Sequence, residues 1–283
     1  MTNKLQSDAP LNGGAKPNVA PKAKKALKGA RKDDSAANRA VAPESGIQAL
    51  QNADQPRGRT LAAGSRSALQ PSRAKRKIPK RSKGHFVGEL VFNREEVRQR
   101  LGFASMLEHN AALCFIYRSD FWDIEEQLDA LPFVLPNGKA SNHFFDFRVT
   151  FKGGRRVCIS VKPERKAQTF EYRAKIECVR KAAIGNICDA VLTVTERNIH
   201  PTELHNAKLF HSARDPEPAL DARIIAGLSA LEGPIQVREF LTNVGLEGCG
   251  FRGVARAIRL GQAKLCNAEK ITPQTLIWKG EVS

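Results

Sequence analysis

Residues 143–162 read HFFDFRVTFKGGRRVCISVK and predict two strands joined by a tight turn. Before the Gly153-Gly154 pair, Phe and Val alternate with polar residues, and after it Val and Ile alternate in the same way. Alternation with a period of two around a Gly-Gly turn is typical of a β-hairpin. The stretch therefore predicts an antiparallel pair with one apolar face.

The register of this hairpin follows from its apolar residues. The two apolar sets share a face only if the numbers of opposed residues add to an even number, as when Phe147 lies opposite Val161 or Ile159. A strict two-residue loop at Gly153-Gly154 gives an odd sum. We therefore expect an odd-length loop or a bulge.

Either register places Asp146 on the other face, opposite Lys162 or Ser160. A carboxylate binds a hard cation, and a nearby lysine can orient an attacking water or offset phosphoryl charge, as phosphodiester cleavage requires. The alternative is an ordinary half-exposed hairpin with scattered charges. The hairpin alone does not decide between them.

Positive charge is concentrated at the front of the chain. The 283 residues include 46 Lys and Arg against 29 Asp and Glu, a net charge of +17. Residues 1–84 hold 19 of these cations and 5 of the acids, a charge of +14, which leaves only +3 for the rest. We expect a polyanionic partner, either nucleic acid or an acidic protein. A solvated leader without a specific role is the alternative.

Residues 1–84 contain no Phe, Tyr or Trp, and their composition predicts disorder. Their densest charge lies just before the predicted folded part, where each neutralised phosphate would add sequence-independent affinity. The cations of this run are Arg73, Lys75, Arg76, Lys77, Lys80, Arg81 and Lys83.

The six cysteines show neither CxxC pairs nor a histidine spacing typical of zinc sites, which favours reduced thiols. No apolar run approaches 18 residues, and the first residues lack a signal-type apolar segment. The sequence therefore predicts a soluble, cytoplasmic protein with no membrane partner.

From residue 88 the composition becomes globular, and local patterns predict a mixed α/β core with helices flanking a sheet. We expect strands at 88–93 and 190–195, helices at 105–117, 168–184 and 204–210, and a loop leading to a strand at 120–127. The apolar stripe of the first helix is predicted to comprise Leu107, Ala111, Cys114 and Phe115, and the inward residues of the second are predicted to be Phe170, Ile176, Val179 and Ala183.

A domain boundary is expected at residues 214–218, RDPEP. Helices are predicted at 220–231, 237–244 and 253–260 and a strand at 274–279, the order found in a winged helix. Arg252, Arg256 and Arg259 share one face of the third helix, which either meets phosphate or faces solvent.

Several short motifs together resemble the TnsA family, the endonuclease subunits of heteromeric transposases, whose nuclease domain belongs to the PD-(D/E)xK superfamily. The first is S-x-L-E at residues 105–108, followed by E-E-Q at 125–127, F-D-F at 145–147, V-K-P at 161–163, V-T-E at 194–196 and Asn206. The likeness covers roughly residues 88–210, and the ordered set carries it because no single motif is specific.

The resemblance implies three regions: a disordered basic tail at 1–84, a nuclease-like domain at 85–213 and a winged-helix-like domain at 214–283. It implies a Mg²⁺-dependent cut, with Mn²⁺ as an alternative cation, in one strand of double-stranded DNA at transposon ends. The implied partners are a DDE-type transposase and an AAA-type ATPase, and the implied location is the nucleoid DNA of a bacterium.

Carried over by position, Glu108 and Asp146 would be metal-binding carboxylates and Lys162 the catalytic lysine. Arg165 and Lys166, just after that lysine, are well placed to meet a phosphate. On local grounds alone, Glu108 reads as a surface residue in a first helical turn.

The chain departs from the family pattern at two positions. Phe145 stands where a proline usually precedes the aspartate, and Ser160 stands where Glu or Gln usually precedes the lysine. A serine hydroxyl is a weaker and shorter ligand, which would act directly or through a water, unless Glu177 takes its place. His143 is predicted to be a strand residue and not a ligand.

Three functions stay open at this stage. The first is an active metal-dependent endonuclease within a transposase. The second is a catalytically weak or inactive subunit that binds DNA and partner proteins. The third, a stand-alone restriction or repair nuclease, is disfavoured because no sequence-reading module is recognised.

Overall fold

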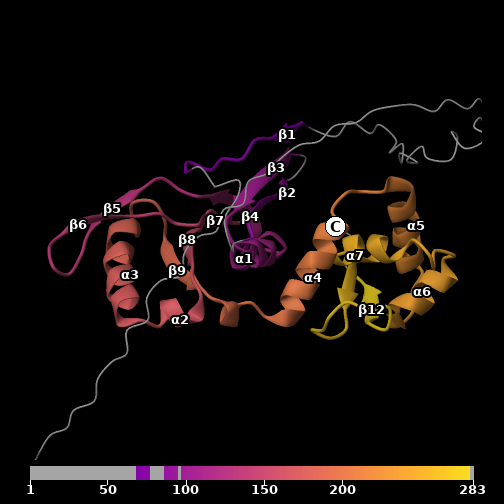
Figure 1. The fold of residues 1–283 in the computed structure, drawn as a ribbon. Helices are drawn as coiled ribbons and strands as arrows, with labels where there is room; N and C mark the ends of the chain where they lie inside the picture. Colours follow the sequence, from indigo (N-terminus) through magenta and orange to yellow (C-terminus); the bar gives the residue numbers. More distant parts are fainter. Residues whose placement is uncertain (1–67, 77–85, 95–96, 281–283) are drawn as a thin grey trace, which may run out of the picture. The chain divides into compact units, whose positions relative to one another are not determined.

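The computed structural model describes residues 68–76, 86–94 and 97–280, which form a mixed α/β protein (Figure 1). The helices are α1 (Met106–Ile116), α2 (Glu164–Ala167), α3 (Phe170–Ala183), α4 (Pro201–Ser212), α5 (Pro218–Ser229), α6 (Val237–Asn243) and α7 (Phe251–Arg259). The strands are β1 (Leu69–Gln70), β2 (Gly88–Arg94), β3 (Val97–Phe103), β4 (Phe121–Glu126), β5 (Leu131–Val134), β6 (Ala140–His143), β7 (Phe147–Phe151), β8 (Arg156–Val161), β9 (Ala190–Val194), β10 (Ile235–Gln236), β11 (Ala263–Leu265) and β12 (Leu276–Lys279).

A four-stranded mixed sheet forms the centre of the fold, in the order β4-β7-β8-β9. The pairs β4/β7 and β7/β8 are antiparallel, whereas β8 and β9 run parallel. A second sheet has the order β1-β3-β2, and β5 pairs with β6 as a separate hairpin. Since β8 and β9 are parallel, the chain must cross between them, and it does so through α2 and α3.

The predicted hairpin is confirmed. Phe147 lies opposite Ile159 and Val149 opposite Val157, so both pairs have even sums. The Phe151 N–H donates to the Arg155 carbonyl at 2.9 Å, which closes a three-residue loop of the predicted odd length. Both glycines of the loop have positive φ, +90° at Gly153 and +86° at Gly154, a region that other residues rarely adopt.

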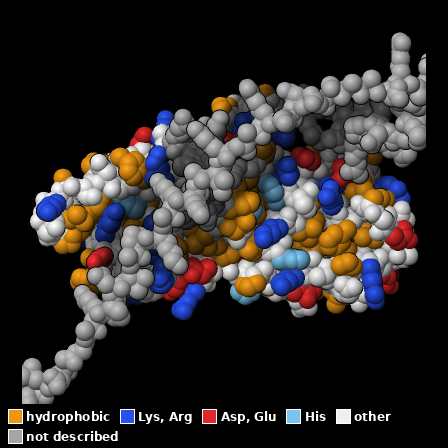
Figure 2. All heavy atoms as spheres, in the orientation of Figure 1, with side chains coloured by type: hydrophobic (Ala, Val, Ile, Leu, Met, Phe, Trp, Pro, Cys, Tyr) orange, Lys and Arg blue, Asp and Glu red, His pale blue; other side chains and the backbone are white. Residues whose placement is uncertain are grey.

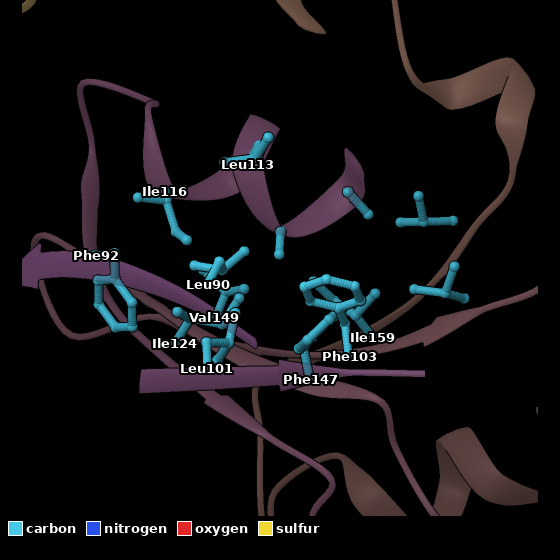
Figure 3. Packing of buried hydrophobic residues seen from close by; sticks show 14 of the residues in the cluster. Leu90, Phe92, Leu101, Phe103, Leu113, Ile116, Ile124, Phe147, Val149 and Ile159 are labelled. Atoms are coloured by element: carbon cyan, nitrogen blue, oxygen red, sulfur yellow. The ribbon is translucent and has the colours of Figure 1, made fainter. Parts of the chain in front are cut away.

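One face of the central sheet packs against α1. Phe147, Val149 and Ile159 join residues of β2 and β3 in an apolar cluster beneath the helix. Figure 3 shows Ile116 on the helix directed toward this cluster, to which Leu113 also belongs. The cluster encloses more of α1 than the predicted stripe, because Ala111, Ala112, Leu113 and Ile116 are all buried, whereas Leu107 and Phe115 are only partly so.

The opposite face is covered by α3 and the β5–β6 hairpin, around Phe145, Cys158 and Val191. As predicted, Ile176, Val179 and Ala183 point into this cluster. The prediction for Phe170 is wrong: this first residue of α3 is 85% exposed, since the helix begins beyond the edge of the cluster.

Six strands, β1, β3, β5, β6, β10 and β11, have no counterpart in the sequence-based expectations, and the predicted loop at 120–127 is largely β4. Residues 68–76 correct the prediction of disorder in part. They include β1, which pairs with β3 in parallel through Leu69 opposite Arg98 and Gln70 opposite Gln99. The rest of the predicted disordered tail, 1–67 and 77–84, lies outside the described residues.

The C-terminal elements surround a third apolar cluster, formed by α5, α6, α7 and the antiparallel sheet β10-β12-β11. The three predicted helices and the final strand are confirmed. Arg256 does not face solvent or phosphate, because it is buried and paired with Asp221 at 2.7 Å and Glu217 at 3.2 Å. Separate folding of residues 85–213 and 214–283 stays a prediction.

On the face shown in Figure 2, Lys and Arg side chains are spread among acidic ones and do not gather in a single patch. This agrees with the small charge of +3 outside residues 1–84. Within the described part of the chain, no helix is long and apolar enough to cross a membrane.

The hairpin loop gives a test of the fold. We expect Gly154→Ala to lower the free energy of unfolding by about 1 kcal/mol or more, because alanine is strained at positive φ. Gly233→Ala is the matched control, since Gly233 has no positive φ and no atom within 4 Å of an added Cβ. Denaturant unfolding measures both, and equal effects of the two substitutions would contradict the loop conformation.

Candidate functional site

Three separate elements bring the predicted catalytic residues together. Asp146 immediately precedes β7, Lys162 immediately follows β8, and Glu108 lies in the first turn of α1. The Lys162 Nζ is 3.5 Å from Oδ2 of Asp146. Glu108 lies close enough to Asp146 and Lys162 for both of their charges to act on its pKa.

Asp146 is held by its backbone and by its side chain. Its N–H donates to the Ile159 carbonyl at 3.0 Å, and its own carbonyl accepts from the Gln127 N–H at 2.8 Å. Its Oδ2 accepts from the Val161 N–H at 2.7 Å. Among the described residues nothing donates to Oδ1, which leaves this oxygen for a ligand. The carboxylate is thus fixed and only 6% exposed.

Glu108 is buried and is not the surface residue that its position in the helix suggests. Ser105 caps α1 by accepting from the Glu108 N–H at 3.1 Å, and its hydroxyl also lies 3.1 Å from Oε1 of Glu108. The Ala104 N–H donates to Oε2 at 2.8 Å. Burial raises the pKa of Glu108, and the Asp146 charge raises it further, while the two hydrogen bonds and Lys162 oppose the shift.

Ser160 faces the interior and is fully buried. Its Oγ lies 2.8 Å from Nε2 of His143 at the end of β6. Burial lowers the pKa of His143 to about 4, and the charges of Lys175 and Lys162 act in the same direction, so the imidazole is neutral at pH 7. Sequence reasoning missed this pair because the β5–β6 hairpin that brings His143 to Ser160 was not predicted.

Tyr172 of α3 belongs to the same region. Its hydroxyl lies 2.9 Å from Oγ1 of Thr193, and it also interacts with the Ser160 hydroxyl. Burial raises the pKa of Tyr172, and the charge of Asp146 adds to the increase. The first turn of α3 is therefore close to Asp146. Glu177 is not, because it is exposed and pairs with Arg180 on the outer side of α3.

The described residues contain no group of three or more His, Cys, Asp or Glu side chains that could hold a metal ion. They offer two adjacent carboxylates, Glu108 and Asp146, whereas the hydroxyl of Ser160 is turned toward His143. Mg²⁺ commonly keeps several waters and binds through one or two carboxylates together with substrate phosphates. The pair fits a cation held in that way, without a direct bond to Ser160.

The residues predicted to bind DNA fall into three groups. Arg165 and Lys166 of α2 are exposed, and no ion pair within the described residues engages them. Arg73 and Arg76 instead bind other parts of the chain, through Asp123 and Gln127. Lys75 is exposed, and its backbone N–H donates to the Gln127 carbonyl at 3.0 Å, whereas Lys77, Lys80 and Arg81 lie outside the described residues.

The other motif residues have structural partners. Glu125 pairs with Arg148 at 2.7 Å, and Glu196 accepts from the Glu164 N–H at 2.9 Å. Thr195 caps the 3₁₀ turn Glu196–Asn198. The side chain of Asn206 donates to the Glu269 carbonyl at 2.9 Å and accepts from the Ile271 N–H at 2.9 Å, tying α4 to the segment before β12.

A cavity of about 470 Å³ lies elsewhere, between α1, β9 and α4. Its lining includes Cys114, Leu192 and Phe210 but not Glu108, Asp146 or Lys162. Burial raises the pKa of Cys114 to about 11, so its thiol stays protonated at neutral pH. The cavity therefore adds no reactive group to the candidate site.

No family model matches the chain, and no curated protein matches it in a sequence comparison.

The buried carboxylate gives a prediction about stability. A raised pKa in the folded state means that the stabilising effect of Glu108 is fully present below its unfolded pKa and is lost as pH rises through the folded pKa. We therefore expect Glu108→Gln to raise the unfolding temperature relative to wild type at pH 7, and this advantage to disappear toward pH 4.

Thermal unfolding across this pH range measures the effect. Glu89→Gln is the control, because Glu89 is 55% exposed and forms only a loose surface pair with Arg100 at 3.8 Å. A Glu108→Gln variant that is equally destabilised at both pH values would contradict the raised pKa.

Proposed function

We propose that this chain is a metal-dependent DNA endonuclease subunit of a heteromeric transposase, cutting one strand at transposon ends beside a DDE-type transposase and under an AAA-type ATPase. The observation that carries the proposal is the convergence of Glu108, Asp146 and Lys162 from three elements that are separate in sequence. The transposase context rests on the order of the sequence motifs.

The architecture supports the same proposal. A mixed sheet with α1 on one face and α3 on the other is what a restriction-endonuclease-like domain requires, with the carboxylates at one end of its central hairpin. The helices α5, α6 and α7 with the sheet β10-β12-β11 are compatible with a winged-helix-like domain. Fold alone does not set function, so the argument depends on the site.

Each residue of the cluster has a role in this proposal. Oδ1 of Asp146 and the carboxylate of Glu108 would hold Mg²⁺ or Mn²⁺, which supplies Lewis acidity toward a phosphate when bound. Lys162 is held by Asp146 and presents its ammonium beside the carboxylates, where it orients the attacking water or offsets the charge that develops on the phosphoryl oxygens. Arg165 and Lys166 bind the flanking phosphates.

The second candidate is a catalytically weak or inactive subunit that delivers DNA and partner proteins. The burial of Ser160 against His143 favours it, because it leaves the cation with two carboxylates. The two candidates differ in the cleavage of DNA, and only the active nuclease requires a divalent cation at Asp146.

Calorimetry with Mg²⁺ and Mn²⁺ tests the cation that the active nuclease requires. We expect wild type to bind and Asp146→Ala to lose binding, because that change removes the free Oδ1. Lys162→Ala should keep the cation but lower the rate of DNA cleavage by about 100-fold or more, since the lysine acts on the phosphoryl charge.

Asp129→Ala is the control for this experiment, because Asp129 is an exposed carboxylate outside the cluster. Failure of the wild type to bind either cation, with transposon-end DNA also present, would reject the nuclease and leave the second candidate.

DNA binding by α2 is tested through its salt dependence. We expect the double variant Arg165→Ala with Lys166→Ala to weaken binding to double-stranded DNA. The slope of log K against log salt should fall in magnitude by about 1.8, roughly 0.9 for each lost phosphate contact.

The double variant Lys152→Ala with Arg155→Ala removes the same charge from the exposed hairpin loop, at the other end of β8. Its slope should stay close to that of wild type. Equal slopes in the two double variants would show that α2 makes no specific contribution.

A further inference from the structure

Residues 68–76, here called the strap, lie along the sheet and are not a free tail. After β1, the Pro71 carbonyl accepts from the side chain of Gln99 in β3. The hydroxyl of Ser72 and the N–H of Arg73, the latter at 3.1 Å, both donate to Oε1 of Glu126, a fully buried residue at the end of β4. The strap thus joins β3 to the end of β4.

A charged pair anchors the middle of the strap. The guanidinium of Arg73 makes two hydrogen bonds to Asp123 at 2.7 and 2.8 Å and one to the Ile124 carbonyl at 2.5 Å. Arg94 of β2 approaches the same carboxylate at 2.8 Å. Burial alone would raise the pKa of Asp123, but Arg73 and Arg94 hold it below its ordinary value. The anchor is therefore charged at neutral pH.

The end of the strap holds Gln127. Its carbonyl accepts from the N–H groups of Lys75 and Arg76, at 3.0 and 3.4 Å. Its Oε1 accepts two hydrogen bonds from the Arg76 guanidinium, the one from Nε at 2.9 Å. Gln127 is fully buried and has φ of +47°, the one positive φ at a residue other than glycine in the described chain. Such a backbone persists only where its surroundings fix it.

Gln127 in turn holds the catalytic aspartate. Its N–H donates to the carbonyl of Asp146 at 2.8 Å, and the N–H of Leu128 donates to the carbonyl of Phe145 at 3.2 Å. The guanidinium of Arg76 also lies 5.4 Å from the centre of the Phe144 ring. Arg76 therefore contacts both Gln127, which is hydrogen-bonded to the Asp146 backbone, and Phe144, which lies two residues before Asp146 in the chain.

We infer that the strap positions Asp146, with Arg76 and Gln127 as positioning residues that act through the backbone hydrogen bond between Gln127 and Asp146. This inference deepens the proposed function and rests on it only for the role of Asp146 as a ligand. It also gives Arg76, which sequence reasoning places on DNA, a structural contact with Gln127 beside the site.

Hydrogen exchange tests the link without any need for activity. In the full-length protein, we expect Arg76→Ala to raise exchange at the amides of Gln127 and Leu128 about tenfold or more, since a hydrogen bond to a charged group is lost. Arg100→Ala removes the same side chain from an exposed pair of neighbouring β3 and should leave these amides unchanged. Unchanged exchange in Arg76→Ala, or an equal rise in Arg100→Ala, would overturn the inference.

Cation binding then separates positioning from a general loss of stability. We expect the Mn²⁺ affinity of Arg76→Ala to fall several-fold at a temperature where the variant remains folded, and Gln127→Glu, which keeps the acceptor for Arg76, to retain near wild-type affinity. Wild-type affinity in Arg76→Ala would contradict the inference. Absence of Mn²⁺ binding in wild type would reject the proposed function, while the exchange data still decide whether the strap holds Asp146.

Discussion

The hydrogen bond from the Val161 N–H to Oδ2 of Asp146 joins the start of β7 to the end of β8. It belongs to the strand register that pairs Phe147 with Ile159, and the rest of the site depends on that register. With Phe147 opposite Ile159, the apolar side chains of both strands face α1. A shift by one residue would turn these side chains toward the other face and move Asp146 away from Lys162. The same pairing therefore determines both the core and the position of the charged groups.

Burial gives the candidate site its electrostatic character. Asp146 and Glu108 are each less than a tenth exposed, and Lys162 is the cation beside them. Burial raises the pKa of Glu108, and the charge of Asp146 adds to the increase, in spite of hydrogen bonds from Ala104 and Ser105. Two buried carboxylates held close together lower the stability of the folded protein. This pattern is typical of sites that bind a cation or a substrate.

Local signals in the sequence predict the central elements but not their long-range partners. Alternation of period two gives the β7–β8 hairpin and its odd-length loop, and Ser105 correctly marks the start of α1. By contrast, β6 has the sequence ASNH, which has no apolar alternation, so the contact of His143 with Ser160 cannot be predicted.

The charge of Arg73 and Arg76 is visible in the sequence, but their partners lie about fifty residues further along the chain. Composition therefore assigned them to a disordered tail. In the structure, tertiary contacts hold residues 68–76 against the folded part of the chain.

The two departures from the pattern of the family that the chain resembles are connected through one side chain. His143 packs edge-to-face against Phe145, with ring centres 4.6 Å apart, and its Nε2 meets the hydroxyl of Ser160 at 2.8 Å. A longer side chain at position 160 would occupy the space that the imidazole fills, because both residues are buried. Serine at this position and histidine at the end of β6 therefore belong together, and the effect of Ser160 on the cation site cannot be judged from the loss of a carboxylate alone.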